Sequence, residues 1–210
     1  MDAVPLGPTE AVPGRPFADV EMTDRDLLIL REMITDLRGV LKEAEVPPGE
    51  IVPYHQMAWR VDNLTHRLMI CNEERLRTHP GLHFVGFCAE RRTDAIFELE
   101  EANAAVVKEF PNSPGILSYS SVKAPDGDWA NLVIHEEPAD RERWREGADH
   151  IRAAEELSPS HYRNIRIHNG HLSALLFDDP EIVVTRTKYF EYGDDAEWRA
   201  ERAVAESPPA

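Results

Sequence analysis

The segment His161–His171, with the sequence HYRNIRIHNGH, places three histidines close together. Clustered histidines could hold a metal ion, bind a cofactor or transfer protons. The segment alternates like a strand, however, and His161 precedes that strand, His168 ends it, and His171 follows a turn. We therefore expect the three rings to point to different places. No HxxxH, HExxH or two-histidine-carboxylate pattern accompanies them, so the sequence does not predict a three-histidine metal site.

Two predicted strands, 129–135 and 162–168, alternate between aliphatic and polar side chains. Successive side chains of a strand point to opposite faces, so each strand has one aliphatic and one polar face. We expect the aliphatic faces to lie under two helices and the polar faces to share the other side of the sheet. That side is either open to solvent or covers a pocket. Its candidate functional residues are Trp129, Asn131, His135, Arg166 and His168.

Each of these polar residues has a chemical and a structural interpretation. Arg166 could bind a carboxylate, a phenolate or a heme propionate with two parallel hydrogen bonds, or could form an ion pair within the protein. His168 and His135 could act as general acid and base, or could lie in water at the rim. Asn131 is the residue least expected in a core, because a buried amide needs partners.

The elements that position these residues follow one order from Leu82 onward. The pattern predicts strand 82–90, helix 94–110, a hairpin of strands 116–123 and 129–135, helix 139–157 and strand 162–168. This strand-helix-strand-strand-helix-strand order is the split βαβ, or ferredoxin-like, arrangement of an α+β fold. Residues 181–192 predict one more strand at an edge of the sheet, where it could pair with another chain.

The remaining segments divide the chain into four parts. Residues 1–21 are rich in proline and glycine, which predicts a disordered or loosely draped segment. Residues 22–80 predict a helical extension, with a first helix from Thr23 to about Glu45 and a second, weaker helix over about 54–77. In the first helix, Asp26 completes an acidic variant of the capping box. Residues 81–193 form the ferredoxin-like domain, and 194–210 predict an acidic tail with a short fraying helix.

Composition limits the possible partners. The chain has 210 residues, 42% hydrophobic and 30% charged, with a formal net charge of -16. This charge argues against nucleic acid or an anionic membrane as the partner, because phosphate-binding surfaces need clustered Lys and Arg. No apolar run long enough for a membrane span and no signal segment occurs, so we expect a cytoplasmic protein. Cys71 and Cys88 lack a CxxC spacing and are expected to be buried free thiols.

Residues 83–170 resemble the dimeric α+β barrel superfamily, and within it the proteins related to antibiotic-biosynthesis monooxygenases. The resemblance rests on WREGADH, from Trp144 to His150 on the predicted second helix, and on YRNIR, from Tyr162 to Arg166 on the last strand. It implies homodimers joined through their open sheet faces, with one pocket per subunit between sheet and helices. Known members include cofactor-free oxygenases, heme-degrading enzymes, chlorite dismutases, aldoxime dehydratases and lactone isomerases, so the fold does not specify the reaction.

The resemblance and the residues together suggest two classes of function. The first is an enzyme that oxidises a small aromatic or redox-active metabolite, either without a cofactor or with heme. His150 would then be the axial ligand or an acid/base, although it could also only pack between helices; His83, His55 and His66 are alternative ligands. Trp129 and Tyr119 suit an aromatic ligand, but also a core. The second class is a non-catalytic protein that binds heme or a metabolite. No GxSxG, P-loop or dinucleotide fingerprint is present.

Overall fold

A computed structural model describes residues 3–43, 51–92, 96–193 and 197–204. The helices and short helical turns are η1 (Pro16–Ala18), α1 (Val20–Glu43), α2 (Glu73–Thr78), α3 (Ile96–Lys108), η2 (Phe110–Asn112), α4 (Pro138–Arg145), α5 (Ala148–Ile151), η3 (Arg152–Leu157) and α6 (Ser158–His161). The strands are β1 (Val4–Leu6), β2 (Gln56–Val61), β3 (Leu64–Ile70), β4 (His83–Arg91), β5 (Ile116–Lys123), β6 (Trp129–His135), β7 (Tyr162–Leu172), β8 (Ile182–Tyr192) and β9 (Glu197–Ala203). The fold is α+β, as the sequence predicts.

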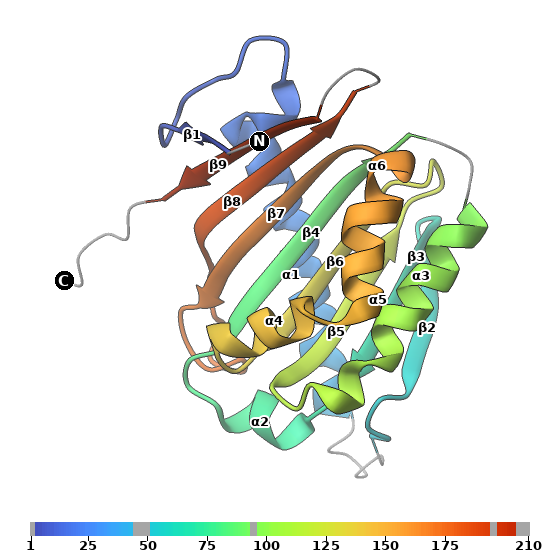
Figure 1. The fold of residues 1–210 in the computed structure, drawn as a ribbon. Coiled ribbons are helices and arrows are strands. Elements are labelled where there is room, and N and C mark those ends of the chain that lie inside the picture. Colours follow the sequence, from blue (N-terminus) through green and yellow to red (C-terminus); the bar gives the residue numbers. More distant parts are fainter. Residues whose placement is uncertain (1–2, 44–50, 93–95, 194–196, 205–210) are drawn as a thin grey trace, which may run out of the picture.

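All described strands belong to one sheet with the order β1-β9-β8-β7-β4-β6-β5-β3-β2. Its centre is the predicted unit β4-α3-β5-β6-(α4–α6)-β7, whose strands lie in the spatial order fourth, first, third, second. Helices α3 to α6 lie on one face of the sheet and α1 lies behind the other (Figure 1). The sheet is therefore a central layer with helices on both sides.

Helix α1 covers the face of the sheet opposite α3 to α6 (Figure 1). The helical spacing of Leu27, Leu30, Ile34, Leu37 and Leu41 predicts one apolar stripe along this helix. The stripe is confirmed, because the last four are buried against the sheet and Leu27 is partly buried there. The approach is close at Gly86 of β4, where an added Cβ would lie 2.4 Å from Leu30 Cδ1. The expectation that the aliphatic faces of both strands lie under the two later helices, with a polar face that is open to solvent or covers a pocket on the other side, is therefore wrong. On β6 the apolar side of α1 packs against the aliphatic residues Leu132 and Ile134.

The N-terminal segment continues this cover over the outer strands. Of the two predicted alternatives, disordered or loosely draped, the described residues fit a draped segment. β1 pairs in parallel with β9, and Phe17 and Ala18 are buried against Tyr189 of β8. Arg202 of β9 is 3% exposed and donates hydrogen bonds to the backbone carbonyls of Gly7, Glu10 and Ala18. One buried guanidinium thus binds three carbonyls of a segment that has little secondary structure of its own.

Residues 54–77 do not form the predicted second helix. They form the antiparallel hairpin β2-β3 and the short helix α2. The turn between the strands is Asp62-Asn63, with positive φ angles of 48° and 67°. Two left-handed residues in a two-residue loop are typical of a tight hairpin turn, and Asp and Asn tolerate that conformation better than most residues. The second part of the predicted helical extension is therefore mainly strand.

The C-terminal region also differs from its prediction. The extra strand is confirmed as β8, but it lies between β7 and β9 and not at an edge. Residues 197–203 form strand β9 where a fraying helix was expected; residues 194–196 and 205–210 lie outside the described chain. Because α1 covers the central strands, two copies of the chain cannot pair through this face of the sheet. The homodimer itself stays a prediction that light scattering would test.

The second helical layer is broken into short pieces. The predicted helix 139–157 is present as α4, α5 and η3, a π-helical turn, followed by α6. π-helical turns are uncommon and often occur at functional sites. Here residues of α4, α5, η3 and α6 line a cavity between this layer and the sheet. In the described part of the chain, no helix combines the length and apolar character needed to cross a membrane.

Candidate functional site

A cavity of about 660 Å³ lies between the sheet and helices α3 to α6. This volume is within the range of small-molecule sites. Its aromatic lining consists of Trp144 of α4 and of strand residues, namely Phe87, Tyr119, Trp129, Tyr162, Phe190 and Tyr192. The cavity is therefore suited to an apolar or aromatic molecule of metabolite size.

The strand register arranges the floor of this cavity in rows across the sheet. Directly paired residues of neighbouring strands share a face, so the row Lys188, Ile167, Phe87, Asn131 faces the cavity. The next row is Arg186, Asn169, Val85, Val133 and Tyr119. Both rows are cationic on β8, largely apolar in the middle and hydrogen-bonding on β6 or β5.

A polar cluster on β5 and β6 ends these rows. The Tyr119 hydroxyl lies 2.5 Å from Asn103 Oδ1 and 2.9 Å from Asn131 Oδ1. The indole N–H of Trp129 donates to the same Asn131 oxygen. Burial raises the pKa of Tyr119, so the phenol keeps its proton. Asn131 is therefore fixed through its carbonyl, while its Nδ2 makes no hydrogen bond to a described residue and can donate to a ligand oxygen.

His150 lines the cavity from α5. Its ring packs edge-on against Trp144, with the centroids 4.6 Å apart. Burial, with a smaller contribution from Arg145, lowers its pKa to about 4, so the imidazole is neutral at physiological pH. Neither ring nitrogen hydrogen-bonds to a residue that the structure describes. A neutral imidazole without a protein partner can ligate a metal or accept a proton.

The structure separates the predicted site residues into three groups, of which the third is His135, described below. Trp129, Asn131, Tyr119 and His150 line the cavity, although their roles stay predictions. Arg166 and His168 lie on the opposite face of the sheet, under α1. The prediction that all polar strand residues share one face is wrong, because Cys88, not Phe87, pairs with Arg166.

His135 lies away from the cavity lining. Its ring stacks on His83 of β4, with the centroids 5.7 Å apart, and Nδ1 lies 2.8 Å from the Glu137 carbonyl. Burial lowers its pKa to about 4. The ring is 2% exposed and not at a solvated rim. His161 lies near the Leu157 carbonyl and His171 near His83, so the three histidines of 161–171 do have different surroundings.

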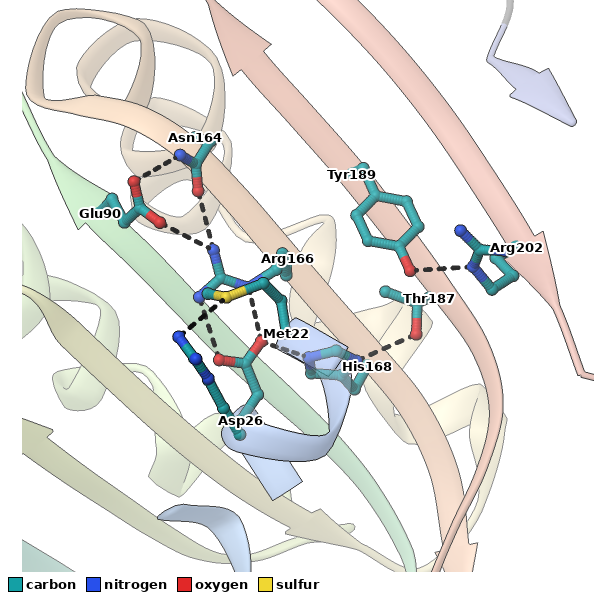
Figure 2. Close-up of polar contacts among 10 residues, drawn as sticks. Met22, Asp26, Glu90, Asn164, Arg166, His168, Thr187, Tyr189 and Arg202 are labelled. Atoms are coloured by element: carbon teal, nitrogen blue, oxygen red, sulfur yellow. Dashed lines mark hydrogen bonds and ion pairs between the residues drawn. The ribbon is translucent and has the colours of Figure 1, made fainter. Parts of the chain in front are cut away.

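Arg166 and His168 belong to a buried network around Asp26 of α1 (Figure 2). Arg166 donates to both Asp26 oxygens, at 2.5 and 3.0 Å, and His168 Nε2 lies 2.9 Å from Oδ2. His168 Nδ1 lies 2.9 Å from the Thr187 hydroxyl. Burial alone would raise the pKa of Asp26, but the hydrogen bonds from His168 and Arg166 lower it. The alternative of an internal ion pair for Arg166 is therefore confirmed.

This network also contains a possible metal-binding group. Ligand atoms of Asp26, Cys88 and His168 lie within 4.8 Å of one another, and all three residues are buried. However, the Arg166 guanidinium already neutralises the carboxylate, and burial raises the pKa of the Cys88 thiol well above its usual value. A protonated thiol beside a fixed cation is a poor site for a metal ion. The arrangement suits a structural role, which holds α1 against β7.

Sequence reasoning missed several cavity and network residues. Asp26 was interpreted as a helix-capping residue, but its carboxylate turns toward the sheet. Arg186 and Lys188 alternate along β8 and could have been assigned to one face, but the partner of that face was unknown. Asn103 lies on α3 among apolar residues, and only its contact with Tyr119 gives it significance.

Comparisons with known proteins do not assign a family. No family model and no curated protein matches the chain. The solved structure of protein SO0527 from Shewanella oneidensis covers 45% of this chain and 92% of its own, at 10% identity and a TM-score of 0.39. PA3566 from Pseudomonas aeruginosa covers 44% and 93%, at 16% identity and a TM-score of 0.37. An aldoxime dehydratase covers 71% and 38%, at 14% identity and a TM-score of 0.31.

Proposed function

We propose that the cavity binds a small, flat, largely aromatic metabolite and supports its oxidation. The observation that carries this proposal is His150, a neutral imidazole that makes no hydrogen bond to a described residue, in an aromatic cavity that also presents the Asn131 amide. Groups whose hydrogen bonds are left unsatisfied around a cavity are candidates for contact with a ligand. The low similarity to solved structures adds nothing to this proposal, which rests on the geometry.

Heme is a cofactor that these residues fit. The walls supply aromatic and aliphatic contacts for a porphyrin, His150 supplies a nitrogen for the iron, and the cations of α4 and β8 are available to propionates. Bound there, heme would supply an iron centre that reacts with oxygen, peroxide or nitrogen-oxygen bonds. Without heme, Asn131 and Tyr119 would orient and polarise an electron-rich substrate that itself reacts with oxygen.

Titration of the purified protein with hemin, followed by absorption, tests the heme proposal. We expect a Soret band that shifts or disappears in His150→Ala and is unchanged in His55→Ala, an exposed histidine outside the cavity. A spectrum that is the same in His150→Ala and wild type would remove His150 as the ligand. Failure to take up hemin would remove heme and leave cofactor-free oxidation.

Turnover distinguishes an enzyme from a binding protein. Protein loaded with hemin or with an aromatic ligand is incubated with oxygen or peroxide, and the small molecule is recovered and analysed. Oxidation of the molecule, lost in Asn131→Leu or His150→Ala, would support the enzyme. A ligand recovered unchanged would overturn the oxidative proposal and favour a metabolite- or heme-binding protein that uses the same cavity.

A further inference from the structure

The β8 side of the cavity carries an excess of positive charge in a chain whose formal net charge is -16. Four cationic side chains line it, two from α4 and two from β8: Arg141, Arg145, Arg186 and Lys188. Acidic chains attract cations and repel anions at long range, so a local group of cations is not explained by composition. The placement needs a local cause, either internal ion pairs or a ligand.

Internal ion pairs account for only part of this charge. Glu142 pairs with both Arg141 and Arg145, while Arg186 is 3.9 Å from Glu201. Arg199, at the same cavity, is fully engaged by Glu197 through two hydrogen bonds of 2.7 and 2.8 Å. Glu155 also lines the cavity and acts on Arg199. With Arg199 included, five cations therefore face four carboxylates, Glu142, Glu155, Glu197 and Glu201. A net positive charge remains.

Lys188 carries the unsatisfied part of this charge. Its ammonium group forms no hydrogen bond or ion pair with a residue in the described ranges. Burial and the nearby Arg186 and Arg145 lower its pKa, and the opposing effect of Glu201, its cross-strand neighbour on β9, is smaller. The group is therefore partly desolvated among charges that are mostly positive. Holding an ammonium in that position costs stability unless an anion joins it.

The remainder of the floor restricts the shape of the anion. Lys188 and Asn131 lie in one row of the sheet, three strand spacings apart, which is about 14 Å at the backbone. Ile167 and Phe87 lie between them and offer only apolar contact. A ligand that satisfies both ends has an acidic group, an apolar body and a hydrogen-bond acceptor at the far end.

We propose that the ligand of the cavity is an aromatic acid, whose carboxylate is bound by Lys188 and Arg186 and whose body lies over Ile167 and Phe87 toward Asn131. This inference rests on the proposed function and adds the class of substrate to it. Arg141, fixed by a 2.6 Å hydrogen bond to Asn169 Oδ1, borders the same acidic group. Lys188 and Arg186 are binding residues here and take no part in bond making.

A matched pair of probes tests the inference: 2-naphthoate and 2-naphthamide, which share the aromatic body and differ in charge. Binding is measured by quenching of tryptophan fluorescence, since Trp129 and Trp144 line the cavity, and by calorimetry. We expect the wild type to bind the carboxylate about tenfold or more tightly than the amide, as is typical of charge-assisted hydrogen bonds. The preference should weaken with added salt.

Variants identify which cationic side chain causes the preference for the carboxylate over the amide. Lys188→Gln and Arg186→Gln should each lower naphthoate affinity by about tenfold and leave naphthamide affinity within about twofold. Arg163→Gln is the control, because Arg163 is exposed and outside the cavity lining but its removal changes the net charge equally. Circular dichroism and urea unfolding report whether each variant is folded.

The outcomes separate the two proposals. Equal affinity for both probes in the wild type, or a preference that survives in Lys188→Gln and Arg186→Gln, would overturn the carboxylate inference and leave an aromatic-binding cavity. A loss equal in size in Arg163→Gln would also overturn it, because net charge alone would explain the result. Binding of neither probe would overturn the proposed function together with the inference.

Discussion

Polar side chains lie on both faces of the central sheet, and the two groups differ in their hydrogen bonding. Under α1, Asp26, Arg166 and His168 form hydrogen bonds with one another in a buried network. Under α3 to α6, His150 and Lys188 border a cavity and make no hydrogen bond or ion pair with a residue that the structure describes. A buried polar group that is fully paired stabilises one arrangement of the chain, whereas an unpaired group beside a void is available to a ligand. The same residue types therefore have structural roles on one face and candidate binding roles on the other.

The largest effect is expected from breaking the network under α1. Asp26→Ala removes the carboxylate that Arg166 and His168 share in the core, and loss of one partner of a buried ion pair typically costs about 3–5 kcal/mol. Urea unfolding at neutral pH measures the loss. Asp24→Ala, two residues earlier and exposed, is the control and should change the free energy of unfolding by less than about 0.5 kcal/mol. A stable Asp26→Ala protein that had lost ligand binding would place this face in the functional site.

A smaller effect is expected where α1 touches the sheet. Gly86→Ala places a Cβ 2.4 Å from Leu30 Cδ1, and overpacking of this kind costs about 1–3 kcal/mol. Gly39→Ala should have the opposite sign: Gly39 is exposed within α1 with nothing near its Cβ position, and alanine favours a helix by about 0.5–1 kcal/mol. Thermal unfolding of both variants measures the difference. Destabilisation by both would mean that α1 does not pack as described.

The smallest effect concerns the cavity histidine and its pH dependence. The pKa of His150 falls from 6.5 to about 4 on folding, so the unfolded chain binds a proton in this range that the folded chain does not. Its contribution to stability is complete above pH 6.5 and is lost as pH falls toward 4. After allowance for solvent screening, we expect His150→Gln to reduce the wild-type loss of stability over that range by about 1–2 kcal/mol. The control His55→Gln should leave the pH profile unchanged.

The spacing of apolar residues and the turn residues within one segment were enough to predict some helices and hairpins. The helical spacing of Leu30, Ile34, Leu37 and Leu41 predicted α1. The turn-forming residues 125–128, Pro-Asp-Gly-Asp, predicted the β5-β6 hairpin. The β2-β3 hairpin was missed although its signal was present: Met57, Trp59 and Val61 alternate with period two before the Asp62-Asn63 turn. Apolar residues at mixed spacing fit a helix and a strand about equally, and the turn should have decided between them.

Segments with little pattern of their own depended on distant partners. Nothing within residues 3–19 predicts order, and the segment is fixed by Arg202 and Tyr189, almost two hundred residues away in the chain. Strand β9 is charged and was expected to be a helix, but it pairs with β8 on one side and β1 on the other. Backbone hydrogen bonds to neighbours outweighed the weak local preference.

Alternation along a strand, read from the sequence alone, determined which residues share a face: Trp129 with Asn131, and Arg166 with His168. It could not determine which face of one strand continues onto the next, because a shift of one residue in register moves every side chain to the other side. Pairing with β4 decided this, by setting Phe87 opposite both Asn131 and Ile167, and Cys88 opposite Arg166. That register, and the choice of α1 to cover the Arg166 side, left Asn131 beside the cavity and enclosed Arg166 in the core.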